Sequence, residues 1–137
     1  MARTRFQAEV LTPEGQVFAG EVEQVSTRTT VGSLSVMAGH QPLLGLLEPT
    51  ELRLYRSENE IERYAQGEGY LQMTGDHALI LVQEAIPPRD LDAADLRDRL
   101  GRAQEEARNA EDDSEEQRQA ERDARRWEAF LRSAEAG

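Results

Sequence analysis

The chain has 137 residues, and its 16 basic and 27 acidic side chains give a formal net charge of 16 − 27 = −11. All the basic residues are arginines, and there is no cysteine. An acidic surface argues against a nucleic-acid binder, which needs basic side chains to neutralise phosphates. No apolar run approaches the roughly 20 residues that cross a bilayer, so we expect no direct membrane insertion.

The composition changes at Pro87-Pro88, a pair that a helix cannot continue across. All five prolines and eight of the ten glycines lie up to this pair, which is typical of a turn-rich segment. Beyond it, 25 charged residues fall within 49 positions and no further proline occurs, which favours helices. We therefore predict two domains, residues 1–87 and residues 88–137.

Short strands with alternating apolar and polar residues are predicted in the first domain. In chain order they cover residues 6–10, 16–19, 21–30, 52–56, 61–65, 70–73 and 77–82, and Gly20 ends the second. Turns at Thr12–Gly15, Ser57–Glu60 and Thr74–Asp76 separate several of them. Many short strands with regular turns predict a sandwich or a flattened barrel, and the residues alone do not separate these two.

Two helices are predicted in the second domain, separated by an acidic break at residues 109–113. Asp90 or Asp92 caps the first, and Ser114 with Gln117 fits a capping box at the second. Apolar residues recur in steps of 4, 3, 4, 3, close to the ~3.5-residue period of a coiled-coil seam. They are Leu96, Leu100, Ala103, Ala107 and Ala110, then Ala120, Ala124, Trp127, Leu131 and Ala134. Since alanine buries little area, at about 25 cal/mol per Å², we expect a weakly held antiparallel hairpin that can open.

The sequence offers little for catalysis or for binding a metal or cofactor. His40 and His77 are the only imidazoles, and neither has a partner at a recognisable motif spacing. The acidic run at 111–116 lacks the glycine and ligand spacing of a calcium loop. Gly67-Glu68-Gly69 lacks the rest of a dinucleotide fingerprint and is interpreted as a bend before a strand. We therefore predict no catalytic residue, no metal site and no cofactor.

Arginines gather on the second predicted helix, which makes it the strongest local electrostatic feature. They are Arg118, Arg122, Arg125, Arg126 and Arg132. Like charges at i, i+4 repel one another unless acidic side chains offset them. Glu121, Asp123 and Glu128 on the same helix are one such offset, and an acidic partner surface or a phosphate is the other. Both interpretations stay open at this point.

Several motifs together resemble the epsilon subunit of bacterial F-type ATP synthases, over essentially the whole chain. Residues 11–22 (LTPEGQVFAGEV) are similar to an early motif of that family. Residues 31–44 (VGSLSVMAGHQPLL) resemble its most recognisable motif, G-E-x-G-x-x-P-G-H-x-P-L-L. Residues 67–71 (GEGYL) resemble its G-G-G-(F/Y)-L segment, and residues 79–82 match its V-T-V-L strand in character. The two predicted helices complete the likeness.

The resemblance implies a ten-stranded β-sandwich followed by a two-helix hairpin. It implies a non-catalytic subunit of the rotor's central stalk, which binds the gamma subunit and the membrane ring of c subunits and couples ring rotation to the catalytic head. It also implies a peripheral location at the cytoplasmic face of the bacterial membrane. In many members of the family the hairpin opens, inserts into the alpha/beta head and inhibits ATP hydrolysis.

Site residues follow from the resemblance position by position. The turn over residues 32–40 would face the ring, with Ser33, Met37 and His40 as contacts. The sequence departs from the family here, because Ser33, Ser35 and Ala38 replace a frequent Glu, a glycine and a proline. On the second helix Arg122, Arg125 and Arg126 would meet an acidic loop of the catalytic beta subunits when the hairpin is open.

Some family members bind ATP on the folded hairpin through I/L-D-x-x-R-A and two arginines. Leu91-Asp92 match this motif and Arg122 and Arg126 keep the arginine spacing, but Asp95-Leu96 replaces Arg-Ala. A carboxylate repels phosphate where a cation should meet it, so we predict weak or absent ATP binding.

Two alternatives to a rotor subunit are a free nucleotide-sensing module and a small β-sandwich hydrolase or lyase built around His40 or His77.

Overall fold

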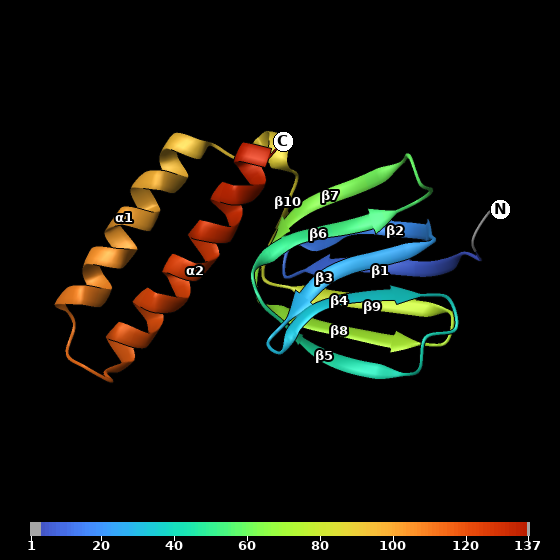
Figure 1. Ribbon diagram of the computed structural model, residues 1–137, viewed down its shortest axis with the longest axis horizontal. Helices are drawn as coiled ribbons and strands as arrows, with labels where there is room; N and C mark the ends of the chain where they lie inside the picture. The colour runs from blue at the N-terminus through green and yellow to red at the C-terminus, as the bar shows by residue number, and fades with distance from the viewer. Residues whose placement is uncertain (1–3, 137) are drawn as a thin grey trace. The chain divides into compact units, whose positions relative to one another are not determined.

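The computed structural model describes residues 4–136 and comprises two compact units with a boundary after Pro87. Residues 1–3 and 137, the outermost positions of the two predicted domains, lie outside the described residues. Figure 1 shows that the first unit is built of strands and the second of two helices. In the described part of the chain, no helix has both the length and the hydrophobicity that crossing a bilayer requires.

Ten strands form the first unit, as the resemblance implies. They are β1 (Phe6–Thr12), β2 (Gly15–Val22), β3 (Gln24–Thr29), β4 (Gly32–Met37), β5 (Leu43–Leu47), β6 (Thr50–Tyr55), β7 (Ile61–Gln66), β8 (Gly69–Thr74), β9 (His77–Val82) and β10 (Ala85–Ile86). One layer has the order β4-β3-β6-β7-β10 and the other β5-β8-β9-β1-β2. The layers meet where β3 pairs with β5 at Thr29 and Leu47, and two flanking backbone hydrogen bonds, Thr30 N to Leu46 O and Glu48 N to Arg28 O, extend this junction, which makes a sandwich close to a barrel.

The inward-facing side chains of both layers form one apolar core. Its fully buried members include Val10, Val25, Leu52, Leu71 and Ile80. They come from five different strands and obey the alternation that the sequence shows, because successive side chains of a strand point to opposite faces. The predicted β-sandwich is therefore confirmed.

Three local predictions in the sandwich are wrong. Gly20 does not end a strand, because it pairs with Ala8 and β2 continues to Val22. The single strand predicted at residues 21–30 is broken at Glu23, which lies between β2 and β3. The predicted turn over residues 32–40 is mostly strand β4, which pairs with β3 from Gly32 to Met37. The chain turns only at Gly39, with a φ of 78° that favours glycine.

The glycines of the 67–69 segment serve backbone packing, as predicted. A Cβ at Gly69 would lie 1.9 Å from the carbonyl oxygen of Leu81 on the neighbouring strand β9. Only glycine fits at this first residue of β8, because real Cβ atoms do not approach a backbone atom so closely. The segment is therefore the tight start of a strand.

The second unit contains a short 3-10 helix η1 (Pro88–Asp90) and helices α1 (Ala93–Asn109) and α2 (Glu115–Ala136). Asp92, rather than Asp90, caps α1, because its Oδ1 accepts from the amides of Ala94 at 3.0 Å and Asp95 at 3.2 Å. At α2 the Ser114 hydroxyl accepts from the Gln117 amide at 3.1 Å. The Gln117 side chain reaches back to the amide of Asp113 rather than Ser114, so the predicted capping box is only half formed.

The seam predicted for α1 is confirmed as buried at two of its five positions, and the seam predicted for α2 is wrong in its second half. Leu96 and Ala103 are buried on α1, and Ala120 is buried at the start of α2. Further along α2 the buried residues are Ala129, Phe130 and Ser133, not the predicted members Leu131 and Ala134, which are only partly buried. Among the described residues, Phe130 is the largest side chain that is fully buried.

Candidate functional site

The outer face of the β5-β8-β9 layer carries exposed apolar side chains in one row. Leu46 of β5 pairs in register with Tyr70 of β8, which pairs with Leu81 of β9. These side chains are 53%, 49% and 42% exposed, and Leu44, two residues before Leu46, is 71% exposed. We call Leu44, Leu46, Tyr70 and Leu81 the apolar stripe. Exposed apolar side chains that lie together are typical of protein–protein interaction sites, so the apolar stripe is a candidate binding surface.

Sequence reasoning missed the apolar stripe, although a signal for it was present. Residues 43–47 and 78–82 are almost continuously apolar. A strand with water on one face shows polar residues at alternate positions, so an unbroken apolar run predicts a strand covered on both faces. In the described chain the inner face of these strands is covered by the core, whereas the outer face exposes the apolar stripe.

The predicted ring contacts Ser33, Met37 and His40 are not brought together. Ser33 and Met37 are exposed on the same face of β4, but four residues separate them, which is about 13 Å along a strand. His40 follows the turn, where its Nδ1 lies 2.8 Å from the carbonyl oxygen of Gln41. Ser33 lies instead near the tip of the β3–β4 turn, where Val31 is 96% exposed. The amide of Thr30 donates to Leu46 O at 3.0 Å, so this tip adjoins the apolar stripe.

The arginines of α2 lie in different environments. Arg126 is only 30% exposed in its side chain, and its Nη2 lies 3.2 Å from Asp123 Oδ1. Its guanidinium carbon also lies 4.1 Å from the centroid of the Trp127 ring. Arg118 donates to the Asp113 carbonyl at 2.6 Å and to Glu115 at 3.1 Å. The prediction that Asp123 offsets an arginine of this helix is confirmed, because Asp123 pairs with Arg126. Arg118 instead pairs with Glu115, which was not among the predicted carboxylates.

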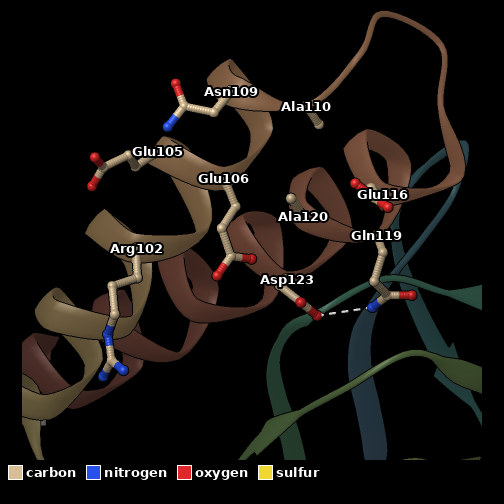
Figure 2. Close-up of a pocket in the computed structure, with 9 residues that line it drawn as sticks. All are labelled: Arg102, Glu105, Glu106, Asn109, Ala110, Glu116, Gln119, Ala120 and Asp123. Atoms are coloured by element: carbon tan, nitrogen blue, oxygen red, sulfur yellow. Dashed lines mark hydrogen bonds between the residues drawn. The ribbon is translucent and has the colours of Figure 1, made fainter.

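A groove of about 580 Å³ separates the two helices near their connection and is strongly acidic. Figure 2 shows Glu105 and Glu106 of α1 on one wall and Glu116 and Asp123 of α2 on the other. Arg102 is the one cation among the lining residues, so the balance is 1 − 4 = −3. Asp123 accepts a hydrogen bond from Gln119 at 3.0 Å. A groove of this charge repels a polyphosphate.

The residues considered for nucleotide binding lie at different levels of the hairpin. Asp92 caps α1 and is occupied by two backbone amides. Arg126 stacks with Trp127, which lies at the level of Arg99 on α1. Seven residues of helix, about 10 Å along the axis, separate Asp92 from that level. Asp95, at the position where the motif has arginine, is 2.7 Å from Arg99 Nε.

Comparisons with known proteins agree with this architecture. Residues 5–88 match the family model described as ATP synthase, Delta/Epsilon chain, beta-sandwich domain. The ATP synthase epsilon chain of Chelativorans sp. is 33% identical over 112 residues, or 82% of each chain. That of Sulfurihydrogenibium sp. is 28% identical over 96% of this chain and 98% of its own length. The chain belongs to the ATP synthase epsilon-chain family.

Other relatives match over shorter stretches, and solved structures match the fold. The epsilon chain of Persephonella marina is 38% identical over 87 residues, and this chain spans 64% of that relative's length. One matching chain comes from a structure of the Euglena gracilis mitochondrial ATP synthase that contains OSCP, F1 and the c-ring. It aligns with a TM-score of 0.83 and 18% identity, over 97% of this chain and 82% of that chain. A chain from a structure of the Tetrahymena thermophila mitochondrial ATP synthase central stalk and c-ring aligns with a TM-score of 0.64 and 15% identity. The alignment covers 98% of this chain and 99% of that chain.

As a member of the epsilon-chain family, this chain is a non-catalytic subunit of ATP synthase. The alternative of a hydrolase or lyase built around His40 or His77 gains no support from the geometry. The imidazole of His77 lies 3.9 Å from Glu9, between Nε2 and Oε2, and both side chains are more than a third exposed. In the described residues no group of three or more acidic, histidine or cysteine side chains is arranged to hold a metal ion.

We expect the isolated chain to bind MgATP more weakly than about 1 mM, because the groove is acidic and Asp95 replaces the cation of the family motif. Isothermal titration calorimetry measures this directly. The Asp95→Arg variant, which restores the motif residue, should bind more tightly than the natural chain. A micromolar dissociation constant for the natural chain would overturn the prediction.

Proposed function

We propose that this chain couples ion-driven rotation of the membrane ring to ATP synthesis and that its hairpin restrains ATP hydrolysis. The match of residues 5–88 to the epsilon-chain family, together with the outward-facing apolar stripe on that same unit, carries the coupling role. The proposed partners are the gamma subunit, the ring of c subunits and, for an open hairpin, the alpha/beta head. We propose no nucleic-acid partner and no direct insertion into the membrane. Attachment through the protein partners places the chain peripherally at the cytoplasmic face of the bacterial membrane.

The apolar stripe is the proposed binding surface for the gamma subunit. A stable protein–protein contact needs a buried apolar centre that excludes water, and aromatic residues are enriched there. Tyr70 lies between Leu46 and Leu81 in the register of three neighbouring strands, which places an aromatic side chain at the centre of the row. The strands themselves are held by the core, so the stripe is rigid before its partner arrives.

Replacing Tyr70 with Arg should weaken binding of the purified gamma subunit at least tenfold, because it would bury a charge at the centre of the contact. Surface plasmon resonance with immobilised gamma subunit measures the effect. Ile61→Arg is the matched control, since Ile61 is a similarly exposed apolar residue of strand β7 in the other layer. Equal losses for the two variants would argue against the stripe as the gamma-binding surface.

The ring is proposed to meet the β3–β4 tip, formed by Val31 and Ser33, rather than the Met37–His40 end of β4. A nearly fully exposed valine at the tip of a turn has no partner in the described chain to exclude water from it. Ser33 follows it directly on the exposed face of β4, whereas Met37 and His40 lie at the opposite end of that strand. The three predicted contacts are therefore divided between two ends.

Single cysteines introduced at Ser33 and at His40 can show which end of β4 faces the ring, because the natural chain has no cysteine that would react in their place. We expect a short photo-activated cross-linker at Ser33→Cys to capture the c subunit in the assembled complex. The His40→Cys variant should give little or no such product. Capture of the c subunit from His40 alone would mean that the opposite end of β4 faces the ring.

The hairpin's inhibitory role is tested by ATP hydrolysis of the assembled complex. A chain truncated after Pro88 should give a several-fold higher rate while retaining the gamma subunit, since the gamma-binding surface lies before that point. Replacing Arg122, Arg125 and Arg126 with Ala should also raise the rate, because these cations are proposed to meet acidic residues of the beta subunits. Replacing Arg102 and Arg108 of α1 with Ala is the charge control. An unchanged rate on truncation would make the hairpin passive.

A further inference from the structure

Two arginines from different helices stack on the only tryptophan of the chain. The guanidinium carbon of Arg126, on α2, lies 4.1 Å from the centroid of the Trp127 ring, and that of Arg99, on α1, lies 5.1 Å from it. Both distances are within the roughly 6 Å at which a cation is attracted to an aromatic face. The contact of Arg99 with Trp127 therefore connects α1 to α2.

The surroundings of the tryptophan allow two like charges to share it. Asp95 pairs with Arg99 at 2.7 Å, and Asp123 pairs with Arg126 at 3.2 Å, so each guanidinium has a carboxylate that offsets its charge. Phe130 packs edge to face against the Trp127 ring, with centroids 6.0 Å apart and an interplanar angle of 80°. Because Phe130 is fully buried, the tryptophan that meets Arg99 is itself held in place.

Two polar side-chain contacts also join the two helices in the described part of the chain. Arg97 and Glu135 form an ion pair at 3.1 Å, but both are at least half exposed, and such pairs are screened by water and salt. Near the connection, the Gln117 side chain donates to the Ala107 carbonyl at 3.3 Å. The small alanines of the seam add little buried area between these points. Among the described residues, the stack of Arg99 on Trp127 is an aromatic contact that joins the two helices between these points.

We propose that the stack of Arg99, Trp127 and Arg126 is a latch that sets the ratio of closed to open hairpin. This inference rests on the proposed regulatory function and extends it. Arg126 belongs both to the latch and to the arginines proposed to meet the catalytic head. Its guanidinium cannot stack on Trp127 beside Asp123 and bind an acidic loop of another subunit at the same time. The closed hairpin therefore competes with the head for one side chain.

The latch is tested by the labelling rate of a single introduced cysteine. Ala120→Cys places a thiol in the buried seam, two turns away from Trp127, in a chain with no other cysteine. When closing is faster than labelling, the rate with a thiol reagent is proportional to the open fraction. In this background Arg99→Gln should raise the rate about 2- to 5-fold, the effect of losing one exposed cation–π contact.

The matched control is Arg102→Gln. Arg102 also lies on α1 and pairs with a carboxylate four residues earlier, Asp98 at 2.6 Å, but it makes no stacking contact with the tryptophan. Its labelling rate should stay at that of the parent. Arg99→Lys, which keeps a cation at the position, should restore slow labelling. An Arg99→Gln rate no higher than that of Arg102→Gln would overturn the latch, provided that circular dichroism shows equal helix content.

Hydrolysis by the assembled complex separates failure of the latch from failure of the proposed function. Arg99→Gln should lower the rate below that of the natural chain, because a larger open fraction reaches the head, while Arg102→Gln should not. Faster labelling of the Arg99→Gln variant would support the latch. If the hydrolysis rate were unchanged both in this variant and on truncation after Pro88, inhibition by the hairpin would be refuted while the latch would stand. Unchanged labelling would refute the latch whatever the hydrolysis rate.

Discussion

Burial of the apolar core between the two five-stranded layers determines the rest of the first unit. Once Leu71 and Ile80 face inward, the two-residue period of a strand forces Tyr70 and Leu81 to face outward. A shift of register by one residue would exchange these faces and expose the core. The apolar stripe is therefore a fixed consequence of the core, and a partner that binds it meets a surface that folding has already organised.

The helical hairpin obeys a different constraint. Three of the six buried residues of α1 and α2 are alanines, which remove less apolar area from water than larger side chains do, so polar contacts carry a larger share of the specificity. Arg97 with Glu135, Arg99 with Trp127 and Gln117 with Ala107 join the helices at three levels. Each of these contacts is weak alone, and an element held in this way can change state at small energetic cost.

The sequence predicted the features that depend on local periodicity. Alternation gave most strands, and capping chemistry limited the start of α1 to Asp90 or Asp92. The turn over residues 32–40 was expected from the family resemblance alone, and the alternation along this segment, with Ser33 and Ser35 exposed and Val36 buried, is that of strand β4. The phase of α2 was misjudged because Trp127 and Phe130, three residues apart, compete for the seam, and only tertiary packing decides that Phe130 is buried. The apolar stripe needs the register of three strands, which no single segment contains.

The placement of charge also separates two ways in which an arginine can act in this hairpin. Arg125 is exposed, so a partner surface can reach it without any change in the helices. Arg126, one residue later, is turned toward Trp127 and Asp123 and becomes available only when that environment is disturbed. An exposed arginine contributes to the rate of encounter with an acidic surface, because its field is felt before contact. A sequestered one contributes only after the hairpin has changed, so in the proposed contact with the catalytic head Arg125 would act early and Arg126 late.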